Sequence, residues 1–214
     1  LARAYTSILA SPAPPDRKLK FLEIFTLTYE KTVEGQALDI NARGVRDFTV
    51  EKYIELVRLK TGYYLACGMV GGAVASGNSN GTIDRIWDLG KLMGPAFQIK
   101  DDLIDLTVGK GRGGVIGSDI KEGKASFLYA YTSEVANADE KEILIEIMTK
   151  QREKTTGDDV KCVLDIYNRY GAIDHAQKYA DDLIKQTYKI IDEIPTDNKT
   201  VFKDIANFMA QRMT

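Results

Sequence analysis

The sequence predicts an all-α protein, and three observations lead to that prediction. Apolar residues recur at the spacing of amphipathic helices, and few segments alternate as strands do. Glycine and proline clusters divide the chain into segments of helical length. One segment also carries Gln98, Asp101, Asp102 and Asp105 on a single stripe of an otherwise apolar helix. With 214 residues, we expect one helical domain over 1–214 with a substantial core.

The expected helices follow in order from their start and stop signals. A short broken start ends at the prolines of segment 11–15, and Asp16, Thr49 and Thr82 are the expected N-caps of the next three helices. Gly94-Pro95 should interrupt the chain before the acidic helix, and 110–123 reads as a mobile, charged loop. The predicted helices are 17 to about 42, 50 to about 76, 82 to 91 or beyond, the acidic helix, 124–136, 139–152, 158–168, 171–193 and 200–212.

Segment 65–75 contains three glycines, although each glycine costs a helix about 1 kcal/mol relative to alanine. This composition indicates close helix packing there, or space made for a ligand.

The bulk composition excludes several classes of function. The net charge of −2 balances 29 basic against 31 acidic residues, which does not favour nucleic-acid binding. Cys67 and Cys162 lack the spacing of a zinc site or a disulfide framework, and a reducing, cytoplasmic setting is expected. The least charged run, 61–82, is interrupted by glycines and polar residues, so we expect no membrane span.

The acidic stripe is the main candidate for chemistry. Three buried carboxylates without a basic residue in the stripe repel one another, and burial raises their pKa values unless a cation lies among them. Oxygen ligands favour Mg²⁺, which takes one or two carboxylates and completes its shell with water and substrate phosphates. We therefore interpret the stripe as a metal face that binds a diphosphate.

A second Asp-Asp-Leu-Ile run provides an internal comparison. Asp181 and Asp182 have Lys178 and Lys185 one turn away, which is typical of a solvated helix face. His175, the only histidine, is expected to be a plain surface residue, and a single histidine argues against a di-iron bundle.

Two glycine-rich matches to nucleotide-binding motifs fail in context. The GxGxxG of 109–114 follows a helix instead of a strand, and the P-loop-like run 117–124 lacks the metal-binding hydroxyl. What this region does contain is four basic side chains able to close over an anionic substrate, namely Lys110, Arg112, Lys121 and Lys124.

Four motifs in order resemble the trans-isoprenyl diphosphate synthase (polyprenyl synthetase) family. They are the GQxxD segment at 35–39, the KTG segment at 60–62, the second aspartate-rich motif at 97–105 and the GxDxxEGK loop at 117–124. The resemblance implies an all-α isoprenoid-synthase bundle around a central cavity, usually a homodimer. It also implies condensation of an allylic diphosphate with isopentenyl diphosphate after Mg²⁺-assisted ionisation.

The resemblance also implies roles for individual residues. Asp101, Asp102 and Asp105 would hold Mg²⁺, and Lys60 and Lys124 would neutralise the departing diphosphate. Thr61, Gln98 and Phe97 would face the allylic cation. Gln36 and Asp39 would line the cavity, and Lys110 and Lys121 would contact substrate.

One part of the family pattern is not found. The first aspartate-rich motif has no match upstream of Arg17, so the sequence is expected to correspond to the C-terminal two-thirds of a synthase, without its N-terminal helices. That segment was removed, lies outside the sequence given, or is absent from a natural subunit. The alternative functions are a non-catalytic regulatory or structural subunit and a class I terpene cyclase.

Overall fold

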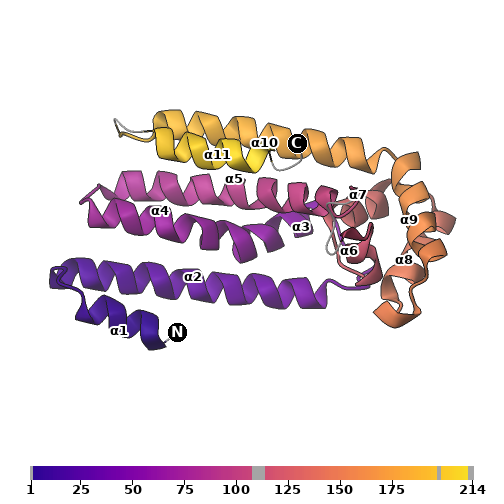
Figure 1. Cartoon of the computed structure of the whole chain (residues 1–214), viewed down its shortest axis with the longest axis horizontal. Coiled ribbons are helices and arrows are strands. Elements are labelled where there is room, and N and C mark those ends of the chain that lie inside the picture. The colour runs from indigo at the N-terminus through magenta and orange to yellow at the C-terminus, as the bar shows by residue number, and fades with distance from the viewer. Residues whose placement is uncertain (1, 108–113, 197–198, 212–214) are drawn as a thin grey trace.

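The computed structural model describes residues 2–107, 114–196 and 199–211, and the secondary structure in these ranges is helical (Figure 1). The elements are α1 (Ala2–Ala10), α2 (Pro15–Asn41), α3 (Val50–Val57), the π-helical turn η1 (Arg58–Gly62), α4 (Tyr63–Ala75), α5 (Asn80–Ile104), α6 (Ser118–Lys121), α7 (Phe127–Val135), α8 (Ala138–Thr149), the 3-10 turn η3 (Arg152–Lys154), α9 (Gly157–Arg169), α10 (Ala172–Glu193) and α11 (Thr200–Gln211). Within these ranges, none of the helices is both long and apolar enough to cross a bilayer.

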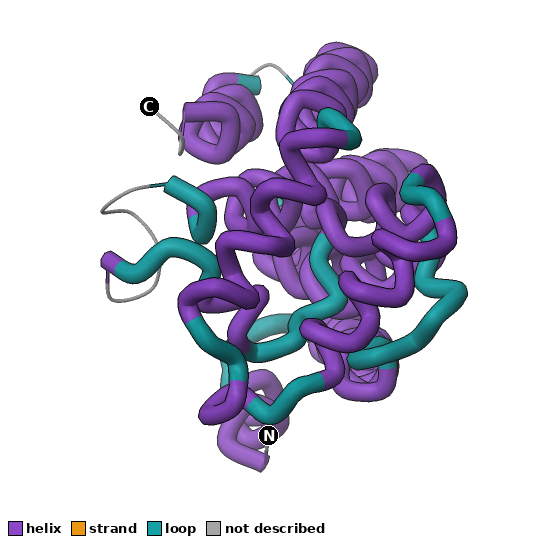
Figure 2. Tube along the Cα trace, turned by 90° about the vertical axis from the view of Figure 1, so that its right-hand side faces the viewer, coloured by secondary structure: helices purple, strands orange, loops and turns teal. Residues whose placement is uncertain are grey.

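The long helices form three layers. Helices α10 and α11 pack on α5, the middle layer of α5 and α4 separates them from α2, and α1 lies beyond α2 (Figure 1). The shorter helices α6 to α9 close one end of the bundle, as the end-on view in Figure 2 shows. Two apolar clusters fill the interior, one around Phe127 and Tyr53 near the short helices and one around Leu89 and Met93 along α4 and α5.

The starts of the long helices differ from expectation in two of three cases. The side chain of Thr49 accepts a hydrogen bond from the Lys52 N–H, as predicted. The cap expected at Asp16 is wrong, because α2 begins at Pro15, where a proline needs no N–H partner. The cap expected at Thr82 is also wrong, because Ser79 caps α5 and places Thr82 inside it.

The interruption predicted at Gly94-Pro95 does not occur, since α5 runs through it without a break. Pro95 removes one helical hydrogen bond. It is buried, however, and the residue before it, Gly94, packs directly against the backbone of Gly62. A Cβ at Gly94 would lie 2.5 Å from the Gly62 backbone nitrogen, so these two helices meet at van der Waals distance. Packing between helices outweighs the local cost of the proline.

The close packing predicted for segment 65–75 is found at Ala66 and not at its three glycines. Cβ atoms at Gly68 and Gly72 would meet nothing within 4 Å, and one at Gly71 would only touch a Phe21 ring carbon at 3.8 Å. The glycines at the tight helix contacts are Gly35, Gly62, Gly90 and Gly94, and a Cβ at Gly90 would lie 2.5 Å from Ala66 Cβ in this segment. The segment packs closely through its alanine, because glycine content alone does not say which side of a helix faces a neighbour.

The start of α9 yields a prediction on acid stability. Asp159 forms a capping box with Thr156 and accepts a hydrogen bond from Lys150 Nζ at 2.8 Å. The lysine and the threonine groups lower the pKa of Asp159 to about 2. A depressed pKa stabilises the fold above the unfolded pKa of about 3.9, and this stabilisation is lost as pH falls through the folded pKa.

We therefore expect Asp159→Asn to lower the urea midpoint at pH 6 by more than at pH 3. The stabilisation that the ionised Asp159 carboxylate gives the wild-type fold is lost between about pH 4 and about pH 2. Equilibrium unfolding followed by circular dichroism measures both midpoints. A loss of equal size at the two pH values would contradict this assignment.

Candidate functional site

Five of the polar residues singled out in the sequence line one pocket of about 470 Å³, namely Asp39, Lys60, Gln98, Asp101 and Lys124. It lies between the C-terminal end of α2, the π-helical turn, the C-terminal part of α5 and the segment around α6. Its lining residues are Asp39, Ile40, Arg43, Lys60, Gln98, Asp101, Asp119, Glu122, Gly123 and Lys124. Carboxylates and cations thus alternate around one opening, as an anion-binding site shared with a metal requires.

A larger pocket of about 740 Å³ lies beside α3, but it is not the candidate functional site. It contains none of the predicted residues, and its lining is Thr49, Val50, Glu51, Lys52, Ile54, Glu55, Arg58 and Tyr179. We assign the site from its chemistry and not from its size.

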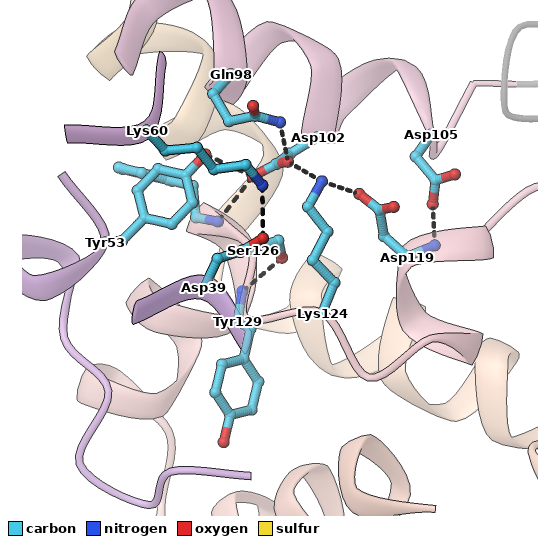
Figure 3. Close-up of polar contacts among 11 residues, drawn as sticks. Asp39, Tyr53, Lys60, Gln98, Asp102, Asp105, Asp119, Lys124, Ser126 and Tyr129 are labelled. Carbon is cyan, nitrogen blue, oxygen red and sulfur yellow. Dashed lines mark hydrogen bonds and ion pairs between the residues drawn. The ribbon is translucent and has the colours of Figure 1, made fainter. Parts of the chain in front are cut away.

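Lys60 reaches the pocket from the π-helical turn between α3 and α4. The Tyr63 N–H bonds to the Arg58 carbonyl, which gives this turn one residue more than an α-helical turn. The Lys60 ammonium donates to Asp39 Oδ2 on α2 at 2.5 Å (Figure 3). Such π-turns occur often at functional sites, because they redirect one side chain without breaking the helix.

Glycine contacts hold this turn on both sides. A Cβ at Gly35 would lie 2.3 Å from the Lys60 backbone nitrogen, and one at Gly62 would lie 3.0 Å from the Gly90 carbonyl oxygen. Gly35 lies one helical turn before Asp39, so the same face of α2 admits the Lys60 backbone and supplies its carboxylate partner. The GQxxD and KTG segments therefore meet in space.

We expect Gly35→Ala to lower the free energy of unfolding by about 1–3 kcal/mol, because the new methyl group meets backbone that cannot move aside cheaply. Gly68→Ala on α4 is the matched control, since its methyl group meets nothing within 4 Å. Urea unfolding should show the control unchanged or stabilised by up to about 1 kcal/mol. Equal effects of the two substitutions would refute the close contact.

The acidic stripe of α5 is divided between the pocket and the protein interior. Gln98 and Asp101 line the pocket. Asp102 and Asp105 are 2% and 6% exposed and turn toward the 117–127 segment. Asp105 Oδ2 accepts the Asp119 N–H at 2.9 Å and so holds the start of α6 (Figure 3).

Asp102 accepts hydrogen bonds from several elements at once. Its Oδ2 receives the Tyr53 hydroxyl at 2.7 Å and the Phe127 N–H at 3.0 Å. Its Oδ1 receives the Lys124 ammonium at 2.8 Å and, at 3.4 Å, the Gln98 amide. Figure 3 shows Tyr53, Gln98 and Lys124 around the carboxylate. The protein itself therefore surrounds this buried carboxylate with four hydrogen-bond donors.

Lys124 joins this carboxylate to a second one. Its ammonium also donates to Asp119 Oδ2 at 2.6 Å. Burial alone would lower the pKa of Lys124, but the charges of Asp102 and Asp119 outweigh it and raise that pKa. Burial raises the pKa of Asp119 to about 6 against the attraction of Lys124. Lys124 therefore stays a cation at neutral pH and occupies the space between two carboxylates.

We expect Tyr53→Phe to cost about 2 kcal/mol of unfolding free energy, because it removes a buried hydrogen bond to a charged group. Tyr129→Phe is the matched control. It removes a hydroxyl from another buried tyrosine, but this hydroxyl donates to the neutral Val45 carbonyl, a bond worth about 1 kcal/mol. Urea unfolding compares the two, and a smaller loss for Tyr53→Phe would contradict the importance of the Tyr53 hydroxyl to the buried Asp102 carboxylate.

The remaining predicted residues lie outside the pocket lining. Gln36 is exposed on α2, Thr61 is half-buried in η1, Phe97 packs against the α4–α5 cluster, and Lys121 is half-buried on α6. Lys110 falls outside the described residues. Their predicted roles stay predictions.

The expectation of a plain surface site for His175 is wrong. Its half-buried ring stacks on Tyr131 with centroids 4.0 Å apart, and burial together with Lys178 lowers its pKa. The sequence around His175 could not predict this stack, because His175 lies on α10 and Tyr131 on α7.

The expected partners of the second Asp-Asp run are half right. Asp182 pairs with Lys185 at 2.8 Å, as predicted. Asp181 instead accepts from the buried Lys100 of α5 at 2.9 Å, so it ties α10 to the acidic helix.

Five residues of the pocket lining were absent from the predicted site residues, namely Ile40, Arg43, Asp119, Glu122 and Gly123. Asp119 lies within the GxDxxEGK segment and contacts Lys124. Arg43 lies in the turn just after α2, four residues beyond Asp39, and no helical spacing in the sequence indicates its place in the pocket.

The pocket is not a preformed metal cage. The described residues contain no group of three or more His, Cys, Asp or Glu side chains poised to hold an ion. Carboxylates of Asp39 and Asp101 nevertheless line the pocket from α2 and α5. This donor set fits a Mg²⁺ ion that takes one or two carboxylates and shares the phosphates of a bound substrate.

Comparisons with known proteins agree with the motifs. A family model described as Polyprenyl synthetase matches residues 1–167. A short chain isoprenyl diphosphate synthase of Methanothermobacter thermautotrophicus is 33% identical over 85% of this chain and 55% of its own length. A geranylgeranyl diphosphate synthase of Saccharolobus solfataricus is 32% identical over 90% of this chain and 58% of its own length.

The fold has close relatives among solved structures as well. A geranylgeranyl pyrophosphate synthetase from Pyrococcus horikoshii superposes with a TM-score of 0.86 at 29% identity, over 99% of this chain and 64% of that one. The chain thus spans about 55 to 64% of the length of these three relatives.

Proposed function

Because the chain belongs to the polyprenyl synthetase family, we propose that its pocket binds the diphosphate of an allylic substrate for prenyl transfer to isopentenyl diphosphate. The expected isoprenoid-synthase fold is shown by the superposition on the Pyrococcus horikoshii synthetase. The observation that carries the proposal is the meeting of Lys60, Lys124 and Asp101 around one pocket, from three segments far apart in the sequence.

In this reaction the bond between the allylic carbon and the diphosphate oxygen breaks, and the oxygen keeps the electron pair. The double bond of isopentenyl diphosphate then attacks the allylic cation, and a proton leaves the new product. The ammonium groups of Lys60 and Lys124 would stabilise the charge that grows on the departing diphosphate. The Gln98 amide oxygen, Thr61 and the Phe97 ring would stabilise the positive carbon.

The carboxylates fall into two roles in this proposal. Asp101, supported by Asp39, would hold Mg²⁺ at the pocket surface. Bound there, Mg²⁺ supplies charge neutralisation to the diphosphate. Asp102 and Asp105, predicted as metal ligands too, hold Lys124 and the start of α6 in the structure, so we propose that they reach a metal only through rearrangement of those contacts.

Further predictions belong to the same proposal. We propose that residues 1–214 form a single polyprenyl synthetase domain. Assembly as a homodimer and a cytoplasmic location are predicted from the family resemblance and the composition. The named relatives are geranylgeranyl and short chain synthases, and the length of this protein's product is left to experiment.

The test is a condensation assay with labelled isopentenyl diphosphate and dimethylallyl, geranyl or farnesyl diphosphate, with Mg²⁺ and with chelator. Mg²⁺-dependent chain extension supports the proposal. Binding of an allylic diphosphate without extension supports the alternative of a non-catalytic subunit. Absence of both extension and Mg²⁺-dependent diphosphate binding contradicts the proposal.

Substitution of Lys124 makes the test specific to this pocket. We expect Lys124→Gln to reduce kcat about 10²- to 10³-fold, the usual cost of removing one group that stabilises charge in the transition state. Lys185→Gln on the exposed face of α10 changes the charge equally but should leave kcat unchanged. Steady-state kinetics compares the two variants, with circular dichroism as the check on folding.

A further inference from the structure

Three cations line the pocket, and two of them are lysines with carboxylate partners. Lys60 is paired with Asp39, and Lys124 is paired with Asp102 and Asp119. Arg43 lines the same pocket, is exposed, and has no hydrogen bond or ion pair with the part of the chain that the structure describes. Its donors are therefore available to a ligand.

The position of Arg43 is set by packing on both sides of the pocket. The turn that carries it is closed by a hydrogen bond from the Val45 N–H to the Ala42 carbonyl at 3.2 Å. The next residue, Gly44, has a φ of +70°, and a Cβ there would lie 2.6 Å from Thr149 Cγ2 at the end of α8.

The turn after α6 packs on the same end of α8. Gly123 has a φ of +62°, and a Cβ there would lie 2.2 Å from the Met148 carbonyl oxygen and 3.3 Å from Arg43 Nε. Lys124 follows directly. Two glycine turns on one helix end thus bring the Arg43 guanidinium beside the segment that carries Lys124.

The chemistry of the side chain indicates its ligand. A guanidinium presents its donors in a planar fork that matches phosphate oxygens and binds them in pairs. A diphosphate carries more negative charge than the two lysines can meet while each remains beside its own carboxylates. Glu122, the acidic residue of the lining next to Gly123, pairs with Arg152 at 2.7 Å.

We propose that Arg43 is a diphosphate-binding residue of this pocket and takes phosphate oxygens at its open rim. This inference rests on the proposed function. The diphosphate would then meet three cations, namely Arg43 from the turn after α2, Lys60 from η1 and Lys124 from the segment after α6. Because Arg43 would hold the phosphates equally before and during C–O cleavage, its loss should weaken binding and raise KM while kcat changes little.

The experiment measures binding of inorganic pyrophosphate in the presence of Mg²⁺ by isothermal titration calorimetry on the whole chain. We expect Arg43→Gln to raise Kd about 10- to 100-fold, as for loss of hydrogen bonds between charged groups. Arg43→Lys should recover part of the affinity, because it restores the charge without the fork. Arg46→Gln is the matched control, since Arg46 pairs with Glu142 outside the pocket and should leave Kd within twofold.

The outcomes separate the two proposals. Pyrophosphate binding by the wild type that Arg43→Gln leaves unchanged overturns the role of Arg43 alone. An equal loss in Arg43→Gln and Arg46→Gln also overturns it, because the effect would then be one of net charge. No binding by the wild type overturns both this role and the proposed function of the pocket.

Discussion

The site depends on one buried carboxylate. Asp102 lies in the interior with a hydroxyl from α3, a backbone N–H from α7 and an ammonium from the end of the α6 segment around it. Removing one partner of such a buried charge typically costs several kcal/mol, because the charge is then left unpaired. Three segments are therefore held together at the point where the pocket forms. Asp102 and Asp119 together hold the Lys124 ammonium at the pocket.

A second constraint is the close approach of backbones around the π-helical turn. Gly35 on one side and Gly94 on the other let α2 and α5 touch the chain that carries Lys60. Ordinary side chains at these positions would separate the helices, and the ammonium would no longer reach Asp39. These glycine contacts bring α2, η1 and α5 together. The three elements supply Asp39, Lys60 and Asp101 to the pocket lining.

Much of the architecture could be predicted from the sequence because it depends on local spacing. The helices from α7 to α11 lie close to their predicted ranges, since their apolar period and their capping residues are properties of neighbouring residues. Predictions failed where tertiary packing overrides local preference. Pro95 continues a helix because α5 is packed along its length, and His175 is half-buried because α7 supplies a stacking ring.

The candidate site also has features that the sequence predicts and features that depend on tertiary packing. The sequence by itself determined the acidic stripe, the two lysines and the family, because motifs are recorded as residue types at short spacings. Only the tertiary structure decided that Asp101 faces the pocket while Asp102 turns inward, and that Arg43 stands beside the Lys124 segment. Those choices depend on contacts between residues far apart in the chain, and helical periodicity cannot say which neighbour will occupy a given face.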